Sequence, residues 1–172
     1  MLKELLLRKN RPSITAATQL VHDDYSLFRE LIVYIGDKKD INLASMAAWT
    51  MSEVVAQNNS LLEPHYKVLL EVANNSRHGG IKRNIVRAFQ FAEIPDTFTW
   101  DVADICLRFL SSKDEPIAVK AYSVTVLQHL ALKIPDIKDE VVFELERQMP
   151  YSTPAFTVRA KAFFKALKKL EK

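Results

Sequence analysis

The chain has 172 residues, of which 48% are hydrophobic and 26% are charged. This composition provides a core for one domain over residues 1–172 and excludes an intrinsically disordered chain. Glycine and proline supply only 10 of the 172 residues, about half of their usual share, which argues against a turn-rich all-β fold. The single cysteine, Cys106, excludes an intramolecular disulfide and a cysteine-rich metal site.

The sequence also lacks the marks of membrane insertion, secretion and nucleotide binding. No apolar run reaches the roughly 20 residues of a membrane span, and the run after Met1 is too short for a secretion signal. We therefore expect a cytoplasmic protein without membrane association. The three glycines cannot form a phosphate-binding loop. The net charge of +3 is uneven, because residues 159–172 hold six basic side chains and one acid.

Apolar residues recur at helical spacing along almost the whole chain, and prolines and capping residues separate the segments. The polar cluster His22-Asp23-Asp24 between two segments suits a helix cap, and Ser60 with Glu63 has the spacing of a capping box. Gly36 and the pair Gly79–Gly80 suit the left-handed conformation that ends helices. The pattern predicts ten helices, at residues 2–9, 12–21, 24–35, 40–57, 61–74, 80–93, 97–111, 115–132, 137–148 and 155–170.

An internal repeat organises these helices. Four segments align without gaps, and their starts are 38, 36 and 39 residues apart: Leu43, Ile81, Ile117 and Phe156. The position one helical turn later is small or aliphatic in every segment, which favours close approach of a partner helix: Ala47, Ile85, Ala121 and Ala160. Another helix precedes each segment. The repeating unit is therefore two helices, about 37 residues long.

Two of the segments carry a recognisable motif. Val119-Lys120-Ala121 and Val158-Arg159-Ala160 resemble the valine–basic–alanine start of the second helix in HEAT repeats, and the period is similar to HEAT and armadillo-like arrays. The resemblance covers residues 24–170. It implies an all-α fold, a right-handed α-α superhelix of about four stacked antiparallel helix pairs over residues 23–172, with residues 1–22 as an N-terminal helical cap. The alternative is an irregular helical bundle whose periodicity is accidental.

The resemblance also indicates where a partner would bind. Second helices line the concave side of such arrays, so their positions outside the core are candidate binding residues: Trp49, Arg83, Arg87, Lys120, Arg159 and Lys165. We expect a non-enzymatic scaffold that binds a protein partner along this surface. The alternative is a nucleic-acid-binding protein related to HEAT-like DNA alkylation glycosylases, although the residues of that family's site cannot be matched one by one. The oligomeric state stays open.

No candidate catalytic or metal site emerges from the remaining residues. Cys106 lies in an apolar helical stripe and is predicted to be buried. The four histidines, His22, His65, His78 and His129, lack the spacings of metal ligands. Carboxylate pairs such as Asp101 with Asp104 are typical of solvated helix faces. We therefore expect no cofactor, no metal and no catalytic residue.

For three groups of side chains, the sequence allows two interpretations each. Arg83 and Arg87 are one helical turn apart and repel each other, so they indicate either salt bridges to a neighbouring helix or an anionic partner. Trp49 and Trp100 are either exposed anchors for a partner or packing residues between repeats. The lysines after residue 160 lie mainly on one face of the last helix, and they are either a solvated helix end or a local nucleic-acid-binding surface.

Overall fold

The computed structural model describes residues 1–170, except for the side chain of Leu170. Within these residues the fold contains ten α-helices, four short 3-10 helices and no strand. None of the helices in this part of the chain has the length and apolar character needed to cross a membrane. The all-α fold expected from the sequence is confirmed.

The helices lie close to their predicted positions. The α-helices are α1 (Leu2–Leu7), α2 (Arg11–Val21), α3 (Tyr25–Gly36), α4 (Ile41–Val55), α5 (Tyr66–Asn75), α6 (Gly79–Phe89), α7 (Thr99–Ser111), α8 (Ile117–Leu130), α9 (Lys138–Gln148) and α10 (Pro154–Leu170). The 3-10 helices are η1 (Asn59–His65), η2 (Asp96–Phe98), η3 (Pro135–Ile137) and η4 (Met149–Tyr151). The largest difference concerns the predicted helix 61–74, whose first part is η1. Pro64 lies there, and an internal proline removes a helical hydrogen-bond donor.

Side-chain caps start some of the helices as predicted. The side chain of Asp24 accepts a hydrogen bond from the backbone N–H of Leu27 at 3.0 Å at the start of α3. The predicted capping box is wrong, because Ser60 lies inside η1 and its hydroxyl donates to Asn58 Oδ1 at 2.9 Å. The left-handed glycines are also wrong, since no glycine in the described residues has a positive φ. Gly36 instead completes α3 in ordinary helical geometry.

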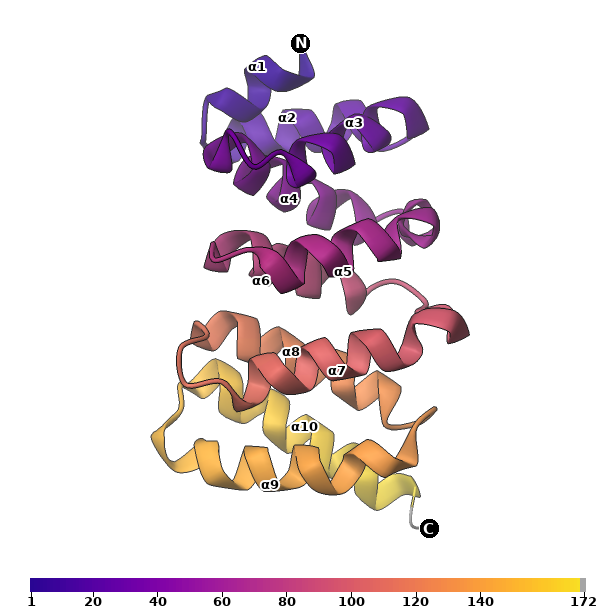
Figure 1. The fold of residues 1–172 in the computed structure, drawn as a ribbon, viewed down its shortest axis with the longest axis vertical. Coiled ribbons are helices and arrows are strands. Elements are labelled where there is room, and N and C mark those ends of the chain that lie inside the picture. The colour runs from indigo at the N-terminus through magenta and orange to yellow at the C-terminus, as the bar shows by residue number, and fades with distance from the viewer. Residues whose placement is uncertain (171–172) are drawn as a thin grey trace. The chain divides into compact units, whose positions relative to one another are not determined.

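The helices form two compact units, which are described separately. Unit 1 is Met1–Phe98, and unit 2 begins at Thr99. In unit 1, α3 packs against α4 and α5 against α6 as antiparallel pairs; α4 also packs against α6, and α3 against α5 (Figure 1). Helices α1 and α2 pack against the other side of α4. In unit 2, α7 pairs with α8, α10 packs against α8, and α9 packs against α7.

Each unit therefore has two layers. We call α2, α4, α6, α8 and α10 the second helices, and α1, α3, α5, α7 and α9 the first helices. The second helices of the four predicted repeats begin at Ile41, Gly79, Ile117 and Pro154, so their starts are 38, 38 and 37 residues apart. This near-constant spacing confirms the helical repeat.

The predicted core face of the second helices is largely confirmed. The column of small or aliphatic residues is buried in all four repeats, with exposed fractions of at most 6%: Ala47, Ile85, Ala121 and Ala160. Their short side chains allow neighbouring helices to pack closely. Ile117 departs from the prediction and is 38% exposed. It is the first residue of α8, where a helix emerges from its turn and the core no longer surrounds it.

Candidate binding surfaces

The second helices of unit 1 meet at Glu53 on α4. Its Oε1 lies 3.2 Å from Nη1 of Arg11 on α2, and its Oε2 lies 3.6 Å from Nη2 of Arg87 on α6. Trp49, one turn earlier on α4, donates its indole N–H to Glu53 Oε1 at 3.1 Å. The side chain of Glu53 is 19% exposed and that of Arg87 is 20% exposed, so solvent screens this pair less than a surface pair. One carboxylate thus connects three neighbouring helices.

Both arginines of this cluster are also held by other contacts. Arg87 donates from Nη1 to the hydroxyl of Ser52 at 2.8 Å, and its guanidinium lies 5.4 Å from the ring centre of Phe91. The guanidinium of Arg11 lies 5.6 Å from the ring centre of Trp49. Both distances are within the range of cation–π interactions. We refer to Arg11, Trp49, Ser52, Glu53, Arg87 and Phe91 as the Glu53 cluster.

The predicted binding residues of unit 1 therefore separate into two kinds. Trp49 and Arg87 belong to the Glu53 cluster, and for Arg87 the predicted salt bridge to a neighbouring helix is confirmed. Arg83 is exposed, and within the described residues it makes no ion pair. Two arginines one helical turn apart thus have different environments. Only Arg83 presents an unpaired charge to an incoming partner.

The predicted binding residues of unit 2 separate in the same way. Arg159 on α10 donates from Nη1 to Thr125 Oγ1 on α8 at 2.6 Å, and its guanidinium lies 4.7 Å from the ring centre of Tyr122. This arrangement fixes the guanidinium on the surface of the second helices. Lys165 on the same helix is exposed, and no partner is found for it in the described part of the chain.

Lys120 requires a correction. It is only 9% exposed, and its ammonium donates to Gln148 Oε1 on α9 at 3.0 Å. Burial and the nearby Arg147 lower its pKa, and Glu144 partly opposes that effect. The side chain points into the interface between helices, so it does not offer a free charge to a partner. The basic residue of the valine–basic–alanine motif is therefore buried between helices in α8 and held at the surface in α10.

The first and the second helices differ in charge. The five second helices hold ten basic residues and one acid, Glu53, whereas the five first helices hold six basic residues and nine acids. The basic residues of the second helices are Arg11, Lys82, Arg83, Arg87, Lys120, Arg159, Lys161, Lys165, Lys168 and Lys169. The net charge of the whole chain is only +3, so it does not reveal this difference. Taken within one unit, second helices with such an excess of positive charge attract anionic partners.

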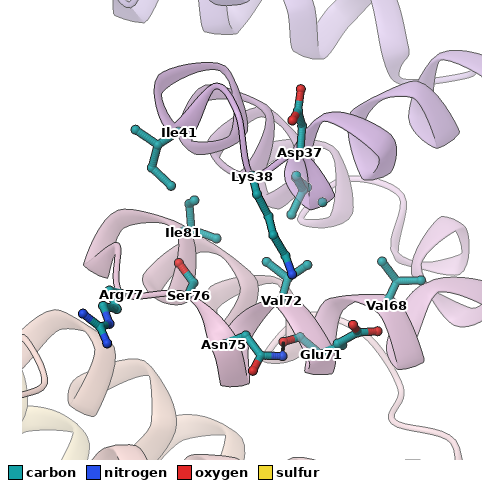
Figure 2. A pocket seen from close by; sticks show the side chains of 12 residues that line it. Asp37, Lys38, Ile41, Val68, Glu71, Val72, Asn75, Ser76, Arg77 and Ile81 are labelled. Atoms are coloured by element: carbon teal, nitrogen blue, oxygen red, sulfur yellow. Dashed lines mark hydrogen bonds between the residues drawn. The ribbon is translucent and has the colours of Figure 1, made fainter.

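A cavity of about 550 Å³ opens in unit 1 between the turn that follows α3 and the turn that follows α5 (Figure 2). Aliphatic side chains form much of its lining: Ile35, Ile41, Val68, Val72 and Ile81. Lys38 extends across it towards Val72 (Figure 2). The volume falls within the usual range of ligand pockets. Its four charged residues, two acids and two bases, sum to zero.

His65 and Cys106 are titratable side chains that packing buries. His65 is 9% exposed, and the ring centres of Tyr25 and Phe28 lie 6.0 and 5.6 Å from its own. Burial, with a smaller contribution from Arg29, lowers its pKa. Cys106 is fully buried, as predicted, and burial raises its pKa to about 12. Among the described residues no group of three or more histidines, cysteines or acids is placed to hold a metal ion.

Sequence reasoning missed Arg11 and Glu53. The interpretation of residues 1–22 as a cap leaves Arg11 outside the predicted second-helix surface. The available signal was local: Glu53 follows Trp49 by four residues, and residues at that spacing face each other on a helix. No sequence pattern near Glu53 predicts its ion pairs with α2 and α6.

The comparisons with known proteins agree with this architecture. The family model described as a HEAT repeat domain matches residues 1–167. The match includes α1 and α2, which pack against α4 within unit 1. Neither the comparison with curated proteins nor that with solved structures gave a significant match. Because the family match spans nearly the whole chain and the helices stack in repeated pairs, the chain belongs to the HEAT repeat family.

Proposed function

We propose that the protein is a non-enzymatic scaffold whose second helices bind an acidic segment of a partner protein. HEAT repeats are helical arrays that present extended surfaces, but a fold alone does not define a function. The observation that carries the proposal is the charge division, with ten basic residues and one acid on the second helices.

Unit 1 supports this proposal through a prearranged surface. The Glu53 cluster holds Arg87 and Trp49 in place by hydrogen bonds before any partner arrives. Binding then costs less side-chain entropy than it would with freely moving side chains. Arg83 lies one turn from Arg87 on α6 and has no ion-pair partner among the described residues. It therefore supplies the charge that an acidic side chain would meet.

Unit 2 supports the proposal through α10. This helix holds five basic residues and no acid between Pro154 and Leu170. Arg159 is fixed by Thr125 and Tyr122, whereas Lys165 is exposed. A fixed guanidinium can bind a carboxylate through two parallel hydrogen bonds. The exposed lysines add attraction at longer range, which increases the rate of association.

Nucleic acid is the second candidate, because the exposed lysines of α10 would also contact phosphates. The details of unit 1 favour a polypeptide. Arg11 and Arg87 share the carboxylate of Glu53, so neither arginine offers a free charge to a phosphate backbone or to an acidic side chain. Trp49 and Phe91 next to these arginines provide the aromatic contacts that are enriched at protein interfaces.

Fluorescence anisotropy of a labelled oligoglutamate peptide tests the proposal, with single- and double-stranded DNA of equal charge as competitors. We expect Arg83→Glu and Lys165→Glu each to weaken peptide binding at least about threefold, since each replaces attraction by repulsion. Lys67→Glu is the matched control, because Lys67 is an exposed base on the first helix α5. Equal weakening by all three variants would indicate unspecific attraction. DNA binding without peptide binding would establish the alternative.

A further inference from the structure

Unit 2 exposes two large aromatic side chains on its first helices. Trp100 on α7 is 59% exposed and Phe143 on α9 is 63% exposed. Helices α7 and α9 pack against each other, and no ring contact is found for either residue within the described part of the chain. Exposed tryptophan and phenylalanine on adjoining helices leave apolar area in water. Aromatic side chains are enriched at protein interfaces.

The same two helices carry a negative charge that the other first helices lack. Together α7 and α9 hold six acids and three bases, whereas α1, α3 and α5 hold three of each. Two of the six acids are neutralised locally, because Asp104 pairs with Arg108 at 3.0 Å and Glu144 with Arg147 at 2.6 Å. Four are exposed and make no ion pair in the described residues: Asp101, Asp139, Glu140 and Glu146.

On each of these two helices, an aromatic and an acidic side chain are four residues apart. Trp100 and Asp104 are four residues apart on α7, and Asp139 and Phe143 are four residues apart on α9. Residues at this spacing lie on the same side of a helix. All four are exposed, so each helix presents an aromatic ring with a carboxylate one turn away. Arg108 pairs with the carboxylate on α7, Asp104, whereas Asp139 on α9 makes no ion pair in the described residues. We call this set, together with Asp101, Glu140 and Glu146, the α7–α9 face.

We propose that the α7–α9 face docks a lysine- or arginine-rich segment of a partner protein. The long aliphatic part of such a side chain covers an aromatic ring while its charge reaches water or a carboxylate. A cation above an indole gains a cation–π attraction in addition. An acidic segment would instead meet four unpaired carboxylates, and a purely apolar segment would leave them without a partner.

The proposal concerns a surface separate from that of the proposed function. The second helices carry an excess of basic residues, and the α7–α9 face carries an excess of acids on the other layer of unit 2. A protein with both surfaces would connect an acidic partner to a basic one. Either surface can be inactivated without changing the other, so the two proposals fail independently.

Tryptophan emission provides the readout. The chain has two tryptophans, so the Trp49→Phe variant of the full chain leaves Trp100 as the single reporter. We expect a nona-lysine peptide to shift the Trp100 emission and to protect it from acrylamide quenching, whereas nona-glutamate does neither. In anisotropy measurements with labelled nona-lysine, Trp100→Ala and the double variant Asp101→Lys/Glu140→Lys should weaken binding at least about fivefold.

Matched controls separate docking from unspecific attraction. Tyr151→Ala removes an aromatic side chain that is 92% exposed elsewhere in unit 2, and Glu71→Lys reverses an exposed charge on α5. Both variants should leave nona-lysine binding unchanged. Circular dichroism confirms that each variant is folded. Arg83→Glu, which tests the second helices, should also leave this binding unchanged.

Three results would overturn the proposal. The first is nona-lysine binding that neither changes Trp100 emission nor depends on Trp100. The second is the absence of nona-lysine binding to the folded chain at low salt. The third is concentration-dependent self-association in sedimentation velocity that Trp100→Ala abolishes, because the occupant of the face would then be a second copy of this chain.

Discussion

The carboxylate of Glu53 on α4 lies 3.6 Å from the guanidinium of Arg87 on α6, and about four fifths of each side chain is buried. The pair joins two successive second helices at the surface proposed for binding. It also explains why a basic residue on this surface need not be available to a partner. Its contribution to stability and that of its neighbours can be measured separately.

Glu53→Gln should destabilise the protein. The substitution removes ion pairs to both Arg11 and Arg87, and partly exposed pairs contribute up to about 1 kcal/mol each. We expect a loss of about 1 kcal/mol in the free energy of unfolding, visible as a lower thermal midpoint. The control is Glu71→Gln, an exposed acid on α5 without an ion pair in the described residues. An equal effect of both substitutions would contradict the role of the cluster.

Arg83→Glu and Arg87→Glu should differ in stability although they are adjacent on α6. Arg83 is exposed and unpaired in the described residues, so its substitution should change the unfolding free energy by less than about 0.5 kcal/mol. Arg87→Glu places a second carboxylate beside Glu53 and removes the bond to Ser52; we expect a loss of about 2 kcal/mol. Urea denaturation of both variants decides the question. The prediction is wrong if the two curves coincide.

Acid should destabilise the fold partly through His65. Burial lowers the pKa of His65 from its ordinary value of 6.5, so the unfolded chain takes up the proton first when the pH falls below that value. The free energy of unfolding therefore decreases as the pH falls below about 6.5. His65→Phe removes this proton uptake. Its stability relative to the natural protein should improve between pH 7 and pH 5, and parallel pH profiles in urea denaturation would refute this explanation.

Cys106 should report the opening of unit 2. The thiol is fully buried and its pKa is raised to about 12. A reagent in solvent therefore cannot reach it easily, and only a small fraction of it is the reactive thiolate. Modification by a thiol reagent should be at least on the order of 10³-fold slower in the folded protein than in denaturant, because it requires opening. A rate in buffer close to that in denaturant would show that α7 does not protect this residue.

Gly36 and Gly80 should respond differently to alanine. A Cβ atom at Gly36 would have no neighbour within 4 Å, whereas one at Gly80 would lie 3.0 Å from His78 Cε1 and 3.2 Å from Ser45 Oγ. Gly36→Ala should therefore stabilise the end of α3 by up to about 1 kcal/mol. Gly80→Ala should be less favourable because His78 must shift. Comparison of the two thermal midpoints tests this, and a reversed order would contradict the described packing.

The helices and their repeat could be predicted from the sequence because both follow from local spacing. Residues four apart share a helix face wherever the helix lies, which is why the column from Ala47 to Ala160 was predicted to be buried and is buried. Cys106 follows the same rule. Local capping was less predictable: Asp24 caps its helix, whereas Ser60 lies inside a 3-10 helix.

Tertiary structure alone decided which basic residues are free. Arg11 and Glu53 are 42 residues apart, Arg87 and Ser52 are 35 apart, and Arg159 and Thr125 are 34 apart. Such contacts depend on how far one helix is rotated and shifted against the next, and no local pattern records this. The motif residues Lys120 and Arg159 occupy equivalent positions in the sequence, yet packing buries the first against Gln148 and fixes the second at the surface. Sequence thus determined the helical repeat, and helix packing determined which of its basic side chains stay exposed.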